Sequence, residues 1–250
     1  MTAGPEQHRL GTSGLGANDP GGWQDITESV SGAVGAAAAV LKPHLRGWIH
    51  AGLAPLALAY GIVLVILTPA GAPRWSAAVF ALATVLLFGT SAVYHRGRWS
   101  EGTNLVLRRL DHSNIFLVIA GTYTPLAVLL LPPATARLLL IIVWSGALAG
   151  IGLRVFWLAA PRWLYVPIYL ALGWVAVAFL PAFARSGGVA IMWLVIAGGL
   201  AYTAGAVIYG LKRPNPSPRW FGFHELFHVG TLVGYVCHAL AVAIAAFSMR

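Results

Sequence analysis

Seven stretches of about twenty mostly apolar residues follow one another through the chain after residue 47. A stretch of this length, wound as an α-helix, crosses the hydrocarbon core of a bilayer. Only 9% of the 250 residues are charged, against roughly 25% in an average soluble domain. The sequence therefore predicts an all-α fold, an integral membrane bundle of seven transmembrane helices. The expected spans are Trp48–Thr68, Trp75–His95, Asp111–Leu131, Ala136–Trp157, Trp163–Phe183, Val189–Leu211 and Trp220–Phe247.

The chain before these spans has a different composition. Residues 1–24 are rich in Gly, Pro and polar residues and have no apolar period, which predicts a disordered N-terminal tail. Residues 25–46 begin with Asp25, which suits a helix N-cap with Glu28 three residues later, and continue through an Ala-rich run. This pattern predicts a juxtamembrane, amphipathic helix on the membrane surface, and a plain tether fits it almost as well. Residues 47–250 then form the transmembrane domain.

The distribution of Lys and Arg over the connecting segments predicts the orientation. One side of the membrane receives the flank before the first span and the second, fourth and sixth loops, with Lys42, Arg46, Arg96, Arg98, Arg108, Arg109, Arg154, Arg162, Lys212, Arg213 and Arg219. The other side receives only Arg74, Arg137, Arg185 and Arg250. Because cytoplasmic loops are enriched in Lys and Arg, we expect a cytoplasmic N-terminus and a C-terminus outside.

The net charge of +9, from 16 Lys and Arg against 7 Asp and Glu, would also suit binding to nucleic acid. Here, however, the arginines lie in short loops between spans, where they set the orientation and meet anionic headgroups. We therefore expect contacts with membrane lipids and none with nucleic acid. The sequence indicates no protein partner.

Three histidines and an aspartate converge on one end of the predicted bundle. His224 and His228 are four residues apart, so they lie one above the other on a helix face. His95 ends the second span and Asp111 begins the third, at the same membrane face. Three neutral imidazoles leave one tetrahedral position of Zn²⁺ open for water or substrate. The sequence thus predicts a zinc site of His95, His224 and His228 at the cytoplasmic end of the bundle.

Asp111 and Ser91 are the candidate catalytic residues beside this site. Asp111 could orient a water molecule, ligate the ion or act as a general base. Ser91 precedes His95 by four residues and therefore shares its helix face one turn deeper. Its hydroxyl could bond to His95 or help to stabilise an oxyanion. A serine in a membrane helix also often bonds back to its own backbone, so for Ser91 the structural interpretation stands beside the functional one.

Four other polar residues need separate interpretations. Glu225 completes the pattern H-E-x-x-H, the zinc-protease signature with Glu as general base. We favour the competing interpretation, a solvated carboxylate at the membrane surface or one stabilised by the helix N-terminus. His238 is ten residues beyond His228, about 15 Å along the helix, so it cannot share the ion and is expected to be hydrogen-bonded inside the bundle. We expect the same of His50, and we expect His112 to face away from the site.

These motifs together resemble a known family. The matching segments are Ser91-Ala-Val-Tyr-His95, Arg108-Arg109-Leu110-Asp111-His112-Ser113, Ala120-Gly121-Thr122-Tyr123-Thr124-Pro125 and Phe223-His224-Glu225-Leu226-Phe227-His228. They resemble the hemolysin III family, also called TrhA, the bacterial branch of the superfamily of adiponectin and progestin receptors and alkaline ceramidases. The resemblance covers roughly residues 44–247 and implies a multi-pass protein of the inner (plasma) membrane with seven helices and an inside N-terminus.

The resemblance also implies roles for single residues. It implies that the three histidines hold zinc, that Asp111 contacts the water on the metal, and that Ser91 is the serine of the S-x-x-x-H motif. The eukaryotic relatives hydrolyse lipid amides such as ceramide. The family name records a haemolytic phenotype, but spans of this kind favour a permanent bundle over a cytolysin that refolds into a pore.

Three functions remain open on the sequence. The first is a zinc-dependent hydrolase of lipid amides or esters, with Asp111 as acid and base and Ser91 as polar support. The second is a non-enzymatic membrane-homeostasis or sensor protein in which zinc is structural. The third is an intramembrane metalloprotease that uses Glu225 as base. Whether the chain is an enzyme, and on which substrate, is not decided by the sequence.

Overall fold

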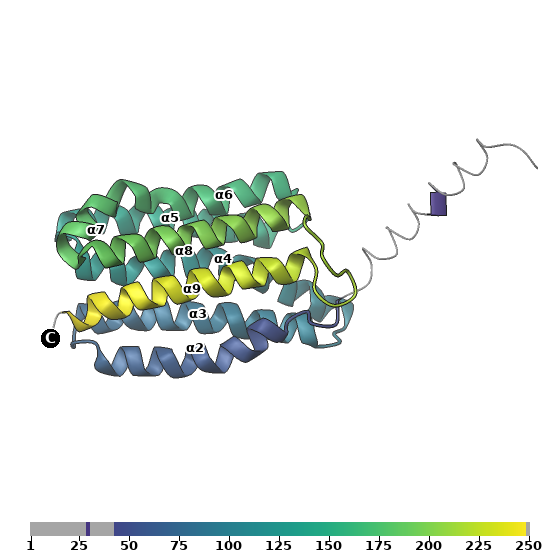
Figure 1. Ribbon diagram of the computed structural model, residues 1–250, viewed down its shortest axis with the longest axis horizontal. Coiled ribbons are helices and arrows are strands. Elements are labelled where there is room, and N and C mark those ends of the chain that lie inside the picture. The colour runs from purple at the N-terminus through teal and green to yellow at the C-terminus, as the bar shows by residue number, and fades with distance from the viewer. Residues whose placement is uncertain (1–28, 31–42, 249–250) are drawn as a thin grey trace, which may run out of the picture. The chain divides into compact units, whose positions relative to one another are not determined.

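The computed structural model describes residues 29–30 and 43–248 (Figure 1). The predicted tail and most of the predicted juxtamembrane helix lie outside this part of the chain. Residues 43–248 contain helices and no strand, which confirms the all-α prediction for the described residues. The elements are α2 (Trp48–Leu67), α3 (Ala72–Arg96), α4 (Glu101–Leu130), α5 (Pro133–Phe156), α6 (Arg162–Trp174), the 3₁₀ segment η1 (Val175–Phe179), α7 (Leu180–Gly187), α8 (Val189–Leu211) and α9 (Phe223–Phe247).

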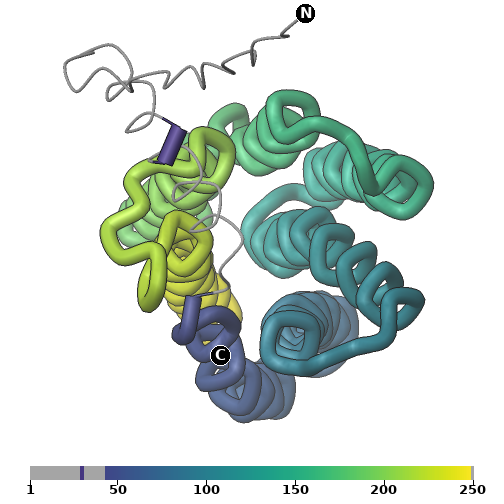
Figure 2. The backbone as a smooth tube through the Cα atoms, turned by 90° about the vertical axis from the view of Figure 1, so that its right-hand side faces the viewer, coloured from purple at the N-terminus to yellow at the C-terminus, as the bar shows by residue number. Residues whose placement is uncertain are grey.

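The described residues form seven helical segments long and apolar enough to cross a membrane when α6, η1 and α7 are taken together. The helices follow one another around the bundle, and α9 returns to lie beside α2 (Figure 2). The most enclosed span is α4, with 67% of its apolar window buried against 28% for α2 and α5. The outer faces of α2 and α5 instead expose Leu and Ile side chains, as contact with lipid tails requires. The predicted seven-helix membrane bundle is therefore confirmed, while its orientation in the membrane stays a prediction.

The start of α4 differs most from the expected boundary. The helix begins at Glu101, ten residues before Asp111, because Ser100 caps it with a side-chain oxygen that accepts from the Thr103 amide at 3.4 Å. The expected start, Asp111, is where the apolar run begins, but the helix already starts before that run. Asp111 therefore lies on the third turn of α4, not on the first.

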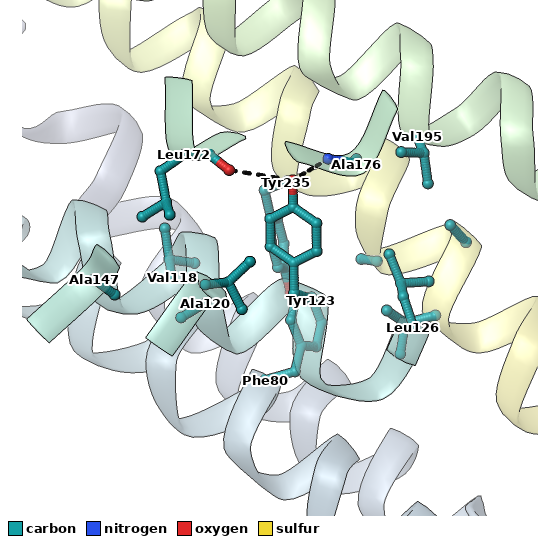
Figure 3. Close-up of a cluster of buried hydrophobic side chains, with 14 of the residues drawn as sticks. Phe80, Val118, Ala120, Tyr123, Leu126, Ala147, Leu172, Ala176, Val195 and Tyr235 are labelled. Atoms are coloured by element: carbon teal, nitrogen blue, oxygen red, sulfur yellow. Dashed lines mark hydrogen bonds between the residues drawn. The ribbon is translucent and has the colours of Figure 1, made fainter. Parts of the chain in front are cut away.

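The fifth span is not one continuous helix. Its regular hydrogen bonding is interrupted at η1, which leaves backbone groups of α6 and η1 without partners in the helix. The hydroxyl of Tyr123 on α4 provides hydrogen-bond partners for these groups. It accepts from the Ala176 amide at 2.6 Å and lies 3.2 Å from the Leu172 carbonyl oxygen (Figure 3). It also lies 2.5 Å from the carbonyl oxygen of Gly173. A phenol on a neighbouring helix thus compensates for the break.

Tyr123→Phe is expected to lower the free energy of unfolding by about 1–3 kcal/mol, because the buried Ala176 amide would lose its acceptor. Thermal unfolding in detergent measures the effect. Tyr169→Phe is the matched control, since the Tyr169 hydroxyl is buried and has no hydrogen-bond partner in the part of the chain that the structure describes. Equal losses in the two variants would show that the Tyr123 hydroxyl does not stabilise the break.

Candidate metal centre

The three predicted ligand histidines lie together at one end of the bundle. His95 is on the last turn of α3, and His224 and His228 are on the first two turns of α9. The Nε2 atoms of His224 and His95 are 3.2 Å apart. One ring nitrogen from each of the three residues lies within 4.8 Å of the other two. The structure therefore brings together, from positions up to 133 residues apart, the set that the sequence predicted.

The spacing of these nitrogens fits a single metal ion. A tetrahedral zinc ion with Zn–N bonds of 2.0–2.1 Å separates two ligand nitrogens by about 3.3 Å, close to the His224–His95 distance of 3.2 Å. Two neutral imidazoles at this distance could also share one hydrogen bond, but a third imidazole within 4.8 Å goes beyond that explanation. Imidazole nitrogens without a thiolate suit zinc and several other divalent transition metals. The donor set thus fits a divalent cation.

Asp111 lies beside this cluster but is not one of its three members. Its Oδ2 is 3.7 Å from Nε2 of His95 and 3.9 Å from Nδ1 of His112. These distances exceed the range of a direct hydrogen bond. A side-chain hydrogen bond connects Ser91 to the Asp111 carboxyl group. Ser91 is therefore placed to orient Asp111, and its expected contact with His95 or with an oxyanion stays a prediction.

A cavity extends from the histidine cluster into the bundle. Its near end includes Ser91 and Asp111, and its wall continues past apolar side chains to His238. Nδ1 of His238 donates to the Gly234 carbonyl oxygen at 2.8 Å, which confirms the expected structural hydrogen bond. His238 and His228 are ten residues apart on α9, so the cavity reaches about 15 Å along the helix. The arrangement combines a polar end at the metal centre with a long apolar chamber.

The prediction for His112 is wrong. Its Nδ1 donates to the Arg108 carbonyl oxygen at 2.7 Å, yet its ring forms part of the cavity wall together with Asp111. Asp111 and His112 are adjacent on the helix and therefore point about 100° apart, but the cavity is wide enough for both side chains to line it.

The prediction for His50 is wrong as well. Neither ring nitrogen of this buried residue has a hydrogen-bond partner within residues 43–248, and the ring instead lies against His228. A sequence signal did exist: the first span begins at the same predicted membrane face as the other histidines, with His50 on its first turn.

Glu225 is fully buried, so the expectation of a solvated carboxylate is wrong, whereas the expected contact with the helix N-terminus is confirmed. Oε2 accepts from the Gly222 amide at 2.8 Å, and Oε1 accepts from Nε of Arg46 at 2.9 Å. Both oxygens thus join the start of α9 to the segment before α2. The H-E-x-x-H pattern here describes two cluster histidines around a structural glutamate.

The two halves of this ion pair are expected to respond differently to mutation. Arg46→Met leaves Glu225 buried without its counter-charge and should cost about 3 kcal/mol of unfolding free energy. Glu225→Gln should cost less, because 22% of the Arg46 side chain is exposed and the guanidinium can reach water. Chemical denaturation of both variants in detergent measures this order. A larger loss for Glu225→Gln, or a loss of bound metal, would contradict the structural role.

Comparison with known proteins shows which proteins the chain resembles over most of its length. A model of haemolysin-III-related proteins matches residues 38–239. The chain is 33% identical over 147 residues to the hemolysin-3 homolog of Bacillus subtilis (strain 168), covering 58% of this chain and 68% of that protein. It is 36% identical over 101 residues to hemolysin-3 of Bacillus cereus, covering 40% of this chain and 46% of that protein. It is 32% identical over 190 residues to the heptahelical transmembrane protein ADIPOR2 of Oryza sativa subsp. japonica, covering 70% of this chain and 83% of that protein.

Proposed function

The chain belongs to the haemolysin-III-related family, and from this premise we propose that it is a zinc-dependent membrane hydrolase of lipid amides or esters. The observation that carries the proposal is the position of the Asp111 carboxylate, 3.7 Å from a cluster histidine and in the wall of a largely apolar cavity. A purely structural metal site needs neither the neighbouring carboxylate nor the cavity. The predicted orientation puts this centre on the cytoplasmic side of the membrane.

In this proposal the three histidines hold zinc, and each other residue of the site has a defined task. Zinc, when bound, supplies a Lewis acid and lowers the pKa of a coordinated water to about 7. Asp111 accepts a proton from the attacking water and returns it to the departing nitrogen or oxygen. Ser91 holds the Asp111 carboxyl group in place through its hydroxyl. The net reaction consumes one water and yields a carboxylic acid and an amine or alcohol.

The shape of the cavity favours a long-chain substrate. Its wall continues from the cluster along α9 to His238 and includes Leu126, Leu180 and Val195. These apolar side chains suit an alkyl chain, while the metal end holds the histidine cluster, Asp111 and Ser91. An acyl chain in the cavity would place its carbonyl group beside the histidine cluster. The substrate is therefore a membrane lipid with an amide or ester bond next to a long apolar chain.

The test is turnover by the purified wild-type protein. The protein is loaded with zinc in detergent and incubated with a ceramide and with an ester-linked lipid, and the released fatty acid is quantified. We expect release from at least one lipid class above the level of an Asp111→Ala control prepared in the same way. Equal release from the two proteins with both lipids would overturn the hydrolase proposal.

One observation favours a second candidate function, a non-enzymatic sensor or homeostasis protein with structural zinc. The three histidines join the end of α3 to the start of α9, and the Arg46–Glu225 pair holds the same end of α9. A metal here would stabilise the association of these helices. In that case chelation lowers the melting temperature sharply and Asp111→Asn has no functional effect. The protease alternative is disfavoured because both Glu225 oxygens already accept structural hydrogen bonds.

A further inference from the structure

One of the three cluster histidines, His228, has no hydrogen bond at Nδ1 among the described residues. A metal-bound imidazole normally donates its second ring N–H to a carbonyl or carboxylate, which fixes the ring orientation. Nδ1 of His228 is buried and has no hydrogen-bond partner within the part of the chain that the structure describes. The plane of the His228 ring must therefore be held by something other than a hydrogen bond at Nδ1.

The ring of His50 lies where it can hold the plane of the His228 ring. It stacks on the His228 ring with centroids 3.8 Å apart and planes inclined by only 10°. His50 also contacts the fully buried Phe88, with ring centroids 5.1 Å apart and ring planes inclined by 66°. Rotation of the His228 ring about its Cβ–Cγ bond would drive its edge into the face of His50. Because His50 is itself 2% exposed and wedged against Phe88, it cannot give way easily.

The nitrogens of His50 do not explain its position. Neither ring nitrogen has a hydrogen-bond partner in the described structure, so His50 and His228 interact through their faces alone. His50 is also not a member of the group of three whose nitrogens lie within 4.8 Å of one another. It is therefore neither a hydrogen-bond acceptor for His228 nor a fourth member of the ligand set.

We propose that His50 is a positioning residue of the metal centre, which holds the His228 ring by face-to-face stacking in the orientation needed for binding. This inference rests on the metal site of the proposed function but not on hydrolysis. It extends the centre to a third helix: α3 and α9 contribute the binding nitrogens, and α2 contributes the support. The start of α2 is thereby coupled to the metal through a side chain that never touches it.

The experiment measures zinc affinity, not activity. Metal-free protein in detergent competes for zinc with a chromophoric chelator, and the wild type is compared with His50→Phe, His50→Ala and His50→Leu. Loss of a supporting contact typically weakens metal binding 10- to 100-fold, so we expect about tenfold weaker binding for His50→Ala and His50→Leu. His50→Phe, which retains an aromatic face, should bind as tightly as the wild type. The visible spectrum of Co²⁺-substituted protein should change with His50→Ala and not with His50→Phe.

The control variant is His238→Ala, which removes another buried imidazole from the cavity wall without touching the cluster and should leave zinc affinity unchanged. Wild-type affinity in His50→Ala and His50→Leu would overturn the proposal, as would binding by His50→Phe as weak as by His50→Ala. Complete loss of zinc in all three variants would show that His50 is a ligand. In His50→Leu the side chain fills much of the volume of the imidazole ring. If His50→Ala does not fold, the zinc affinity of His50→Leu is compared with that of His50→Phe instead. A wild-type protein that binds no zinc would refute the metal centre as a whole, whereas the other outcomes concern His50 alone.

Discussion

Asp111→Asn is expected to reduce hydrolysis by a factor of about 10²–10⁴ while zinc stays bound. A positioned general acid–base group typically contributes this factor, and an amide cannot accept the proton that the carboxylate takes. Asn has nearly the same size as Asp and retains an oxygen for the hydrogen bond with Ser91. The metal should remain because Asp111 is outside the group of three nitrogens that fit one ion. The initial rate of fatty-acid release and the zinc content are measured on the same preparation.

Ser91→Ala is the matched comparison for this variant. It removes the hydroxyl that contacts Asp111 but leaves the carboxylate, so the rate should fall less than with Asp111→Asn. A wild-type rate in Asp111→Asn would remove the carboxylate from the reaction and favour the sensor alternative. Loss of zinc together with activity would identify Asp111 as a ligand.

The fold was predictable because the bilayer imposes a strong pattern on the sequence. Each span must be apolar over about twenty residues, so seven such segments predict seven helices. The boundaries of α4 were not predictable from this pattern, because α4 continues for about three turns before the apolar run, with Ser100 as its cap. The break at η1 was also missed. Its local sequence, Val175–Phe179, is as apolar as a helix interior, and the phenol that compensates for the break lies on α4.

The histidine cluster was predictable for a related reason. Once the spans are alternated across the membrane, His95 and the α9 pair must lie at the same depth, and helix periodicity places His224 and His228 on one face. Contacts between side chains from different helices were beyond this reasoning. The burial of Glu225 depends on Arg46, 179 residues away, and the stacking of His50 on His228 depends on the approach of α2 to α9. The sequence therefore predicts how deep a residue lies along the membrane normal. Which side chains lie beside each other at a given depth depends on how the helices pack.

His228→Ala is expected to abolish zinc binding at the centre. The wild type should carry about one equivalent of zinc after purification, since its three imidazoles fit one tetrahedral ion. Without His228 the remaining pair, His95 and His224, offers only two protein nitrogens, and the metal should be lost on dialysis against a weak chelator. Metal analysis of detergent-purified protein measures this loss directly.

The same variant should also separate metal binding from folding. A ligand present at 1,000 times its Kd stabilises the folded state by about 4 kcal/mol, so chelation should lower the melting temperature of the wild type clearly. His228→Ala should melt at one temperature with or without chelator. His238→Ala should behave like the wild type in both assays, because its imidazole lies about 15 Å further along α9. Zinc retained at one equivalent by His228→Ala, with wild-type sensitivity to chelation, would show that the ion binds elsewhere and that the histidine cluster is not a metal centre.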